Sequence, residues 1–202
     1  AEEVRGSSHK TVVGAVTAQL AVAIAILQAV PIRIQNLVSL DLEEHLVERG
    51  NRVYVLIPGE EVKNGRPYQF ELPCEVVDLI AWYCTEYRDL LVRQPTTALF
   101  PGEDGDSKKA STLGVQITKR IQTYLGLDVN PHLFRHVAAK LYLDRRPGEY
   151  ALVSRLLNHK SVATTMRAYT GTESVSAARH YQNLVQDLRS AECKPVAKRV
   201  TR

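Results

Sequence analysis

The longest apolar stretch lies near the start of the chain, where no charged residue occurs between Lys10 and Arg33. Residues 11–29 are rich in strong helix formers and carry apolar side chains on nearly every face, which predicts a helix surrounded by other helices. The helix should end before Pro31, because the residue ahead of a proline disfavours helical geometry. The stretch is long enough to span a membrane, but its glutamines and many alanines favour a buried core helix. A membrane-anchored protein remains the alternative.

A second helical piece is predicted over residues 32–40, because Ile34, Leu37, Val38 and Leu40 have the spacing of a buried helix face. Arg33 emerges from this apolar neighbourhood. A desolvated guanidinium needs an anionic partner, which is either an internal carboxylate or the phosphate of a ligand.

Three runs rich in strand-forming residues follow, at 45–49, 52–57 and 68–72. The dipeptide Asn64-Gly65 is a strong turn signal between the last two runs. These features predict a small three-stranded antiparallel sheet with Lys63 near a hairpin tip. An exposed lysine there normally serves solubility, unless the hairpin bends over a site.

The rest of the chain has mainly helical periodicity, which places Trp82 in the core and leaves 94–110 as a surface loop. Helices are predicted over 73–93, 111–125, 131–143, 150–158, from 161, and over 174–189. Ser111 should cap the second of these and Gly126 should stop it. In the fourth, the side chains expected to point inward are Leu152, Val153, Leu156 and Leu157. Gly171 should break the chain after Tyr169, and a basic tail covers 194–202. The fold class is therefore α+β, mainly helical with one small sheet and no interior domain boundary.

Composition adds only broad limits to this picture. The 202 residues, 45% of them hydrophobic, are enough for a sizeable core. A net charge of +4 permits a nucleic-acid partner without indicating one. The cysteines at 74, 84 and 193 form no C-x-x-C pattern, so neither a zinc site nor a disulfide framework is expected, and a reducing cytosol is the natural location.

The segment from Asn130 to His136 contains the first candidate site. Pro131 suits the first turn of a helix, which places His132 and Arg135 on one face near the positive end of the helix dipole. A histidine and a guanidinium in this position form a candidate anion site, and phosphate is the best-suited anion. A chance pair on a solvated helix face is the alternative.

Four segments, in order along nearly the whole chain, resemble the tyrosine recombinases, also called the phage-integrase family. They are AVPIRIQNLVSL at 29–40, VKNGRPYQFELP at 62–73, PHLFRH at 131–136 and LLNHKSVATTMRAY at 156–169. The resemblance implies a mainly helical catalytic domain over 1–202 that cuts and rejoins DNA. It also implies that the family's amino-terminal DNA-clamping domain is missing from this chain.

The resemblance also implies a role for each candidate residue. Arg33 and Arg135 hold the scissile phosphate, Lys63 protonates the departing 5′ oxygen, His132 is the base, His159 bonds the phosphate and Tyr169 is the nucleophile. Two guanidinium groups can hold the negative charge that develops at phosphorus, so neither a metal nor another cofactor is expected. A tyrosine hydroxyl, with an ordinary pKa of about 10, needs a proton acceptor and a positive field.

The partner implied by the resemblance is double-stranded DNA, bound by a homo-tetramer in the cytoplasm, at the nucleoid, with no membrane. Residues 174–202 would contact a neighbouring subunit, although a helix that closes its own core is an equal alternative. Lys119 and Arg120 would contact the DNA backbone if their face is not merely solvated.

Three positions depart from the family pattern. Asn36 stands where an acidic residue is usual, Asn158 replaces a common glycine, and the interval from His159 to Tyr169 is slightly long, which makes Tyr181 a rival nucleophile. A site-specific recombinase or integrase acting through a 3′-phosphotyrosyl link is the main hypothesis. The alternatives are a catalytically weak DNA-binding accessory protein and a related topoisomerase or telomere resolvase.

Overall fold

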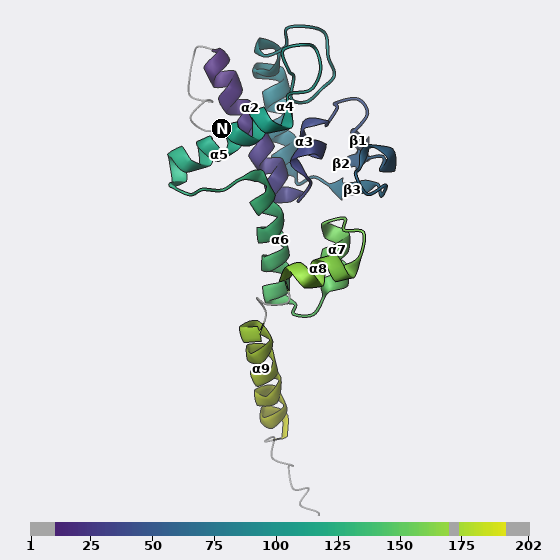
Figure 1. Cartoon of the computed structure of the whole chain (residues 1–202), viewed down its shortest axis with the longest axis vertical. Helices are drawn as coiled ribbons and strands as arrows, with labels where there is room; N and C mark the ends of the chain where they lie inside the picture. Colours follow the sequence, from purple (N-terminus) through teal and green to yellow (C-terminus); the bar gives the residue numbers. More distant parts are fainter. Residues whose placement is uncertain (1–10, 170–173, 193–202) are drawn as a thin grey trace, which may run out of the picture.

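Helix α2 (Val12–Ala29) is the central element of the main core in this computed structural model, which describes residues 11–169 and 174–192 (Figure 1). The Thr11 side chain accepts the Gly14 N–H at 3.0 Å and caps the helix, which ends at Ala29, before Pro31, as predicted. Its buried face packs against α4 (Cys74–Glu86), α5 (Ala110–Leu125) and α6 (Pro131–Arg145).

Within the described residues, α2 is also the one helix that is long and apolar enough to cross a membrane. Its polar residue Gln19 is fully buried, however, and donates to the Tyr83 hydroxyl at 3.2 Å. The same side chain accepts a hydrogen bond from the Lys108 ammonium. These contacts with α4 and the loop before α5 support a core helix rather than a membrane span.

Helix α3 (Ile34–Val38) is shorter than the predicted segment 32–40. Arg33 has extended backbone geometry, with φ −76° and ψ 149°, so it precedes the helix as its N-cap residue. The side chains of Leu37, Val38 and Leu40 are buried as predicted. Arg33 is thereby fixed at the edge of the core, with its guanidinium outside it.

The predicted three-stranded antiparallel sheet is confirmed, in the order β1-β2-β3. Strands β1 (Leu46–Arg49), β2 (Arg52–Ile57) and β3 (Tyr68–Glu71) have Val55 paired with Leu46 on one side and with Phe70 on the other. The connection from β2 to β3 contains the 3₁₀ turn η1 (Gly59–Glu61) and a turn at Gly65, whose φ of +72° suits glycine. Lys63 is exposed in this connection.

Two further predicted helix boundaries, those of α4 and α5, are also wrong. Helix α4 ends at Glu86 and not at 93, because the Arg88 guanidinium turns inward and donates to the carbonyls of Thr96 and Ala98. A short 3₁₀ turn, η2 (Arg88–Leu90), follows. Helix α5 begins at Ala110, so Ser111 lies inside its first turn and is not the cap. The predicted stop at Gly126, with φ +67°, is confirmed.

Helix α6 extends from the main core to a second, smaller core, where α7 (Tyr150–Leu156) and α8 (Val162–Tyr169) lie beside it (Figure 1). The side chains buried in this second core are those of Ala139, Leu143, Val153, Leu157 and Tyr169. Leu152 is 45% exposed, so its predicted inward orientation is wrong. The turn after α7 places Asn158 in the left-handed region, with φ 47°.

The last helix, α9 (Ser174–Glu192), continues past the end of α6 in Figure 1. His180 Nε2 lies 3.3 Å from the backbone oxygen of Arg145, and the apolar side chains of Leu184 and Leu188 are exposed. Gly171, Cys193 and the basic tail at 194–202 lie outside the described residues, whereas Cys74 and Cys84 are free.

Candidate active site

The first turn of α6 provides the candidate anion site. The Asn130 side chain caps the helix by accepting the backbone N–H groups of His132 at 3.0 Å and Leu133 at 3.1 Å. Pro131 occupies the first turn as predicted. His132 is exposed there, whereas Arg135 is only 3% exposed. The helix therefore directs one buried cation and one accessible imidazole toward the region between the two cores.

The guanidinium groups of Arg33 and Arg135 are joined by one hydroxyl and one carbonyl. Arg33 Nη1 donates to the Tyr68 hydroxyl at 3.2 Å, and that hydroxyl lies 3.4 Å from the Leu157 carbonyl, to which it donates. Arg135 Nη2 donates to the same carbonyl at 2.7 Å, and its Nη1 donates to the carbonyl of Pro31. These bonds fix both arginines from three separate segments of the chain.

Neither guanidinium is paired with a carboxylate within the described residues. Burial lowers the pKa of Arg135, and the nearby Arg33 charge acts in the same direction. The internal carboxylate considered as a partner for Arg33 is therefore absent from this part of the structure. Two adjacent uncompensated cations favour binding of an external anion.

His132 and His159 lie within electrostatic reach of both arginines. Burial is the main cause that lowers the pKa of each imidazole, and Arg33 and Arg135 lower both pKa values further. His159 Nδ1 is 2.8 Å from the hydroxyl of Thr165, a fully buried residue of α8. The two histidines are consequently held neutral near pH 7 in the absence of an anion.

Tyr169, at the end of α8, is only 6% exposed, and its hydroxyl lies 2.9 Å from His136 Nδ1. Burial raises the pKa of this hydroxyl, while the Arg135 charge opposes the increase. The rival Tyr181 is 68% exposed on α9. None of the contacts described for Tyr181 joins it to the two arginines, so the structure places Tyr169 and not Tyr181 in the cluster.

The β2–β3 connection folds over this cluster. Arg66 Nη1 donates to the His159 carbonyl at 3.2 Å, and Asn158 Nδ2 donates to the Arg66 carbonyl at 2.8 Å. The Lys63 ammonium is exposed, and no hydrogen bond or ion pair binds it within the described residues. The hairpin thus presents a free lysine close to the turn that carries His159.

Asn36 is buried, and its Nδ2 atom lies 3.5 Å from the Glu61 carbonyl, to which it donates. The contact joins α3, next to Arg33, to the segment immediately before Lys63. An amide can make this bond and a carboxylate cannot, because the bond needs a donor on the side chain.

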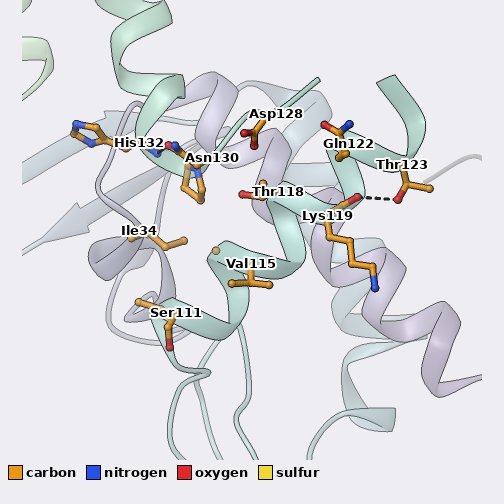
Figure 2. A pocket seen from close by; sticks show the side chains of 13 residues that line it. Ile34, Ser111, Val115, Thr118, Lys119, Gln122, Thr123, Asp128, Asn130 and His132 are labelled. Atoms are coloured by element: carbon orange, nitrogen blue, oxygen red, sulfur yellow. Dashed lines mark hydrogen bonds between the residues drawn. The ribbon is translucent and has the colours of Figure 1, made fainter. Parts of the chain in front are cut away.

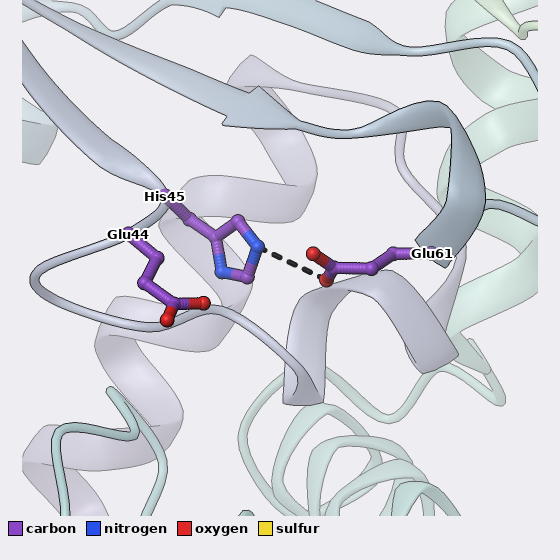
Figure 3. Close-up of side chains that lie close together, drawn as sticks. All are labelled: Glu44, His45 and Glu61. Carbon is purple, nitrogen blue, oxygen red and sulfur yellow. Dashed lines mark ion pairs between the residues drawn. The ribbon is translucent and has the colours of Figure 1, made fainter.

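Glu44, His45 and Glu61 form a cluster whose potential ligand atoms lie within 4.8 Å of one another (Figure 3). His45 Nδ1 accepts the Asp41 N–H at 2.9 Å, so the ring proton sits on Nε2, which faces Glu61 Oε2 at 3.0 Å. A metal on Nε2 would require that proton to move to Nδ1, against the Asp41 N–H. The cluster therefore does not fit a metal, and the buried Nε2 approaches Glu61 without forming a hydrogen bond.

An open groove of about 950 Å³ extends from the first turn of α6 along α5. Figure 2 shows His132 at one end of the groove, with its ring turned away from the α5 side chains. Lys119 lines the groove, whereas Arg120 donates to the hydroxyls of Thr17 and Tyr124. Lys119 and Arg120 were both expected to contact the DNA backbone, and of these two residues Lys119 is the one that lines the groove.

Comparisons with known proteins identify the family and the fold of the chain. The family model described as "Phage integrase family" matches residues 8–174. A crystal structure of the XerH site-specific recombinase bound to difH substrate in a pre-cleavage complex is 21% identical, with a TM-score of 0.63, and the match covers 82% of this chain and 46% of that one.

The post-cleavage XerH complex with palindromic difH is 20% identical with a TM-score of 0.66, and the match covers 88% and 49% of the two chains. The XerA recombinase is 20% identical with a TM-score of 0.59 and coverages of 85% and 61%. The chain thus spans about half the length of the solved XerH structures. No curated protein matches the sequence. At these identities the structures show a shared fold, which confirms the predicted helical domain with its small sheet.

Proposed function

Since this chain belongs to the phage integrase family, the tyrosine recombinases, we propose that it is the catalytic part of a site-specific recombinase or integrase. It would cleave and rejoin DNA through a 3′-phosphotyrosyl intermediate. The observation that carries the proposal is the buried tyrosine, Tyr169, beside Arg135, which itself lies near Arg33, with neither arginine neutralised by a described carboxylate.

In the proposed site, Arg33 and Arg135 bind the non-bridging oxygens of the scissile phosphate. The planar guanidinium groups are preorganised by Tyr68 and Leu157, so little reorganisation is needed as charge develops. His159 bonds the same phosphate after its imidazole gains a proton in the field of the anion. The positive charge comes from these side chains, so the proposed reaction needs no metal ion.

Cleavage forms a bond between the Tyr169 oxygen and phosphorus as the bond from phosphorus to the 5′ oxygen breaks. The 5′ oxygen takes a proton from Lys63, which the hairpin holds near His159 without a competing partner in the described residues. The tyrosine proton passes to a histidine of α6, which by the resemblance is His132. Attack of another 5′ hydroxyl on the phosphotyrosine reverses these steps and joins a new strand.

Double-stranded DNA is the proposed partner, in keeping with the XerH complexes, which hold difH substrate. The net charge of +4 is compatible with this. We further propose a homo-tetramer on DNA, acting in the cytoplasm at the nucleoid. Residues 174–202 would make the contact between subunits, because Leu184 and Leu188 expose apolar side chains on α9.

An assay of products distinguishes this proposal from its alternatives. Two labelled duplexes that carry the target site, selected from a randomised library by covalent capture, are incubated with the protein. Recombinant joints between the duplexes support a recombinase, whereas relaxation of supercoils or closed hairpins alone indicates a topoisomerase or a telomere resolvase. Binding without strand breakage indicates an accessory protein. The double substitution of Leu184 and Leu188 by aspartate should prevent joints while leaving single-site cleavage intact.

A further inference from the structure

The imidazole of His136 lies against the Tyr169 hydroxyl, with Nδ1 2.9 Å from the hydroxyl oxygen. His132, the histidine expected to act as base, lies one helical turn earlier on α6. The two imidazoles meet edge to face, with ring centroids 4.7 Å apart. His136 therefore contacts both His132 and the tyrosine.

This contact is built by packed elements of the second core. His136 follows the buried Arg135 on α6, and Ala139 and Leu143 of the same helix pack with Tyr169 of α8. The rings of His136 and Tyr169 have centroids 5.7 Å apart. Because both partners belong to rigid helices of one core, their separation is set by the fold and not by a mobile side chain.

The chemistry of the Tyr169 hydroxyl indicates that it is the proton donor in this contact and that His136 is the acceptor. Burial raises the pKa of Tyr169, so the hydroxyl is protonated near neutral pH and needs an acceptor before it can attack phosphorus. An imidazole with its proton on Nε2 presents a lone pair at Nδ1, which is the atom that faces the hydroxyl. This is the arrangement of a general base with its substrate proton.

We propose that His136 is a catalytic residue and accepts the Tyr169 proton during strand cleavage. The Tyr169 O–H bond breaks as the bond from oxygen to phosphorus forms, and the proton moves to Nδ1 to give an imidazolium. In rejoining, His136 returns the proton to the departing tyrosine. His132 then acts on the phosphate side and stabilises the pair through its edge contact. This inference rests on the proposed recombinase chemistry and assigns one proton within it.

The test measures single-turnover cleavage of a nicked duplex by the wild-type protein and by His136→Asn, His136→Ala, His132→Asn and Lys63→Ala. A second substrate has sulfur in place of the 5′ bridging oxygen, so that its leaving group needs no proton. Each rate is recorded across pH 5.5 to 9.0, a range chosen to include the ordinary histidine pKa of about 6.5. Circular dichroism and DNA affinity establish that each variant is folded.

We expect His136→Asn to slow cleavage by about 10²-fold or more and to remove the rise of rate with pH. The sulfur substrate should restore Lys63→Ala but not His136→Asn, because His136 acts on the nucleophile. Incorporation of difluorotyrosine at position 169, which lowers the phenol pKa, should restore His136→Asn in part.

Three outcomes would overturn the inference while leaving the recombinase proposal intact: an unchanged pH profile in His136→Asn, rescue of His136→Asn by the sulfur substrate, or loss of the pH-dependent limb in His132→Asn alone. If His136→Ala does not fold, the cleavage rates of His136→Asn alone test the inference. Failure of the wild-type protein to form any adduct would instead contradict the recombinase chemistry on which the inference depends.

Discussion

The side-chain amide of Asn64 donates to two oxygens of Asn158, the backbone oxygen at 2.5 Å and Oδ1 at 3.1 Å. Asn64 follows Lys63 in the hairpin, and Asn158 precedes His159 in the turn after α7. The pair thus connects the proposed proton donor to a proposed phosphate ligand. Asn158 can make this contact because it adopts the left-handed region, which asparagine tolerates better than most residues.

The first prediction concerns this connection. Asn64→Ala removes three hydrogen bonds, the two to Asn158 and the one that Oδ1 accepts from the Arg66 N–H, and should lower the free energy of unfolding by about 1–2 kcal/mol. Cleavage should slow further because Lys63 is less well placed, and the sulfur-containing substrate should restore the rate. Asn51→Ala, at the exposed turn between β1 and β2, is the matched control and should have wild-type cleavage. Equal cleavage by both variants would show that the pair does not position Lys63.

The Tyr68 hydroxyl links the two arginines, which leads to the second prediction. Tyr68→Phe keeps the buried ring but leaves Arg33 without its acceptor. We expect cleavage to fall by about tenfold, the equivalent of one hydrogen bond to a charged group, with a smaller change in DNA affinity. Tyr54→Phe on β2, whose hydroxyl lies 3.4 Å from Glu71 Oε2, is the control. Wild-type cleavage kinetics in Tyr68→Phe would show that the Tyr68 hydroxyl does not help to position Arg33.

The third prediction follows from the lowered pKa values of His132 and His159. In the unfolded chain both titrate near 6.5, so on acidification from about pH 6.5 the unfolded state takes up protons first and the protein loses stability. A bound DNA phosphate favours the charged imidazoles and should raise both pKa values. Nuclear magnetic resonance titration of the ring protons, with and without DNA, measures this directly. Values above 6.5 in the free protein would contradict the lowered pKa values.

Gln19 provides the fourth prediction, which concerns the core and not the site. Gln19→Ala leaves the buried Tyr83 hydroxyl and the Lys108 ammonium without a partner in this helix. The free energy of unfolding should therefore fall by about 1–3 kcal/mol. Gln28→Ala, on the exposed face of the same helix, should have little effect. Equal effects in a denaturant titration would argue against the core position of α2.

Local sequence pattern was sufficient for most of the fold. The apolar content of 11–29, the Asn64-Gly65 turn and the proline at 131 each act through neighbouring residues, and α2, the sheet and α6 form as expected. The error at the end of α4 arises because a side-chain contact with the following loop decides the local structure. The Arg88 side chain bonds to the loop at 96–98 and ends α4 early, which periodicity cannot reveal.

The same distinction applies to the site. The motifs contained all six expected residues, and the structure brings five of them, Arg33, His132, Arg135, His159 and Tyr169, into one cluster beside the Lys63 hairpin. Tyr68, Asn64 and His136 were not assigned roles. Asn64 and Asn158 are 94 positions apart, so their contact depends on the complete fold. His136 could have been suspected, since it lies one turn after His132 within the quoted motif.

The most direct test of the central claim is covalent capture on a nicked duplex, whose short cleaved strand diffuses away and prevents rejoining. The protein is incubated with this substrate, denatured, digested and mapped by mass spectrometry. We expect a DNA-linked peptide modified at Tyr169, and no adduct in Tyr169→Phe. An adduct at Tyr181 would contradict the assignment of the nucleophile. A protein that binds the duplex without forming any adduct would contradict the proposed chemistry itself.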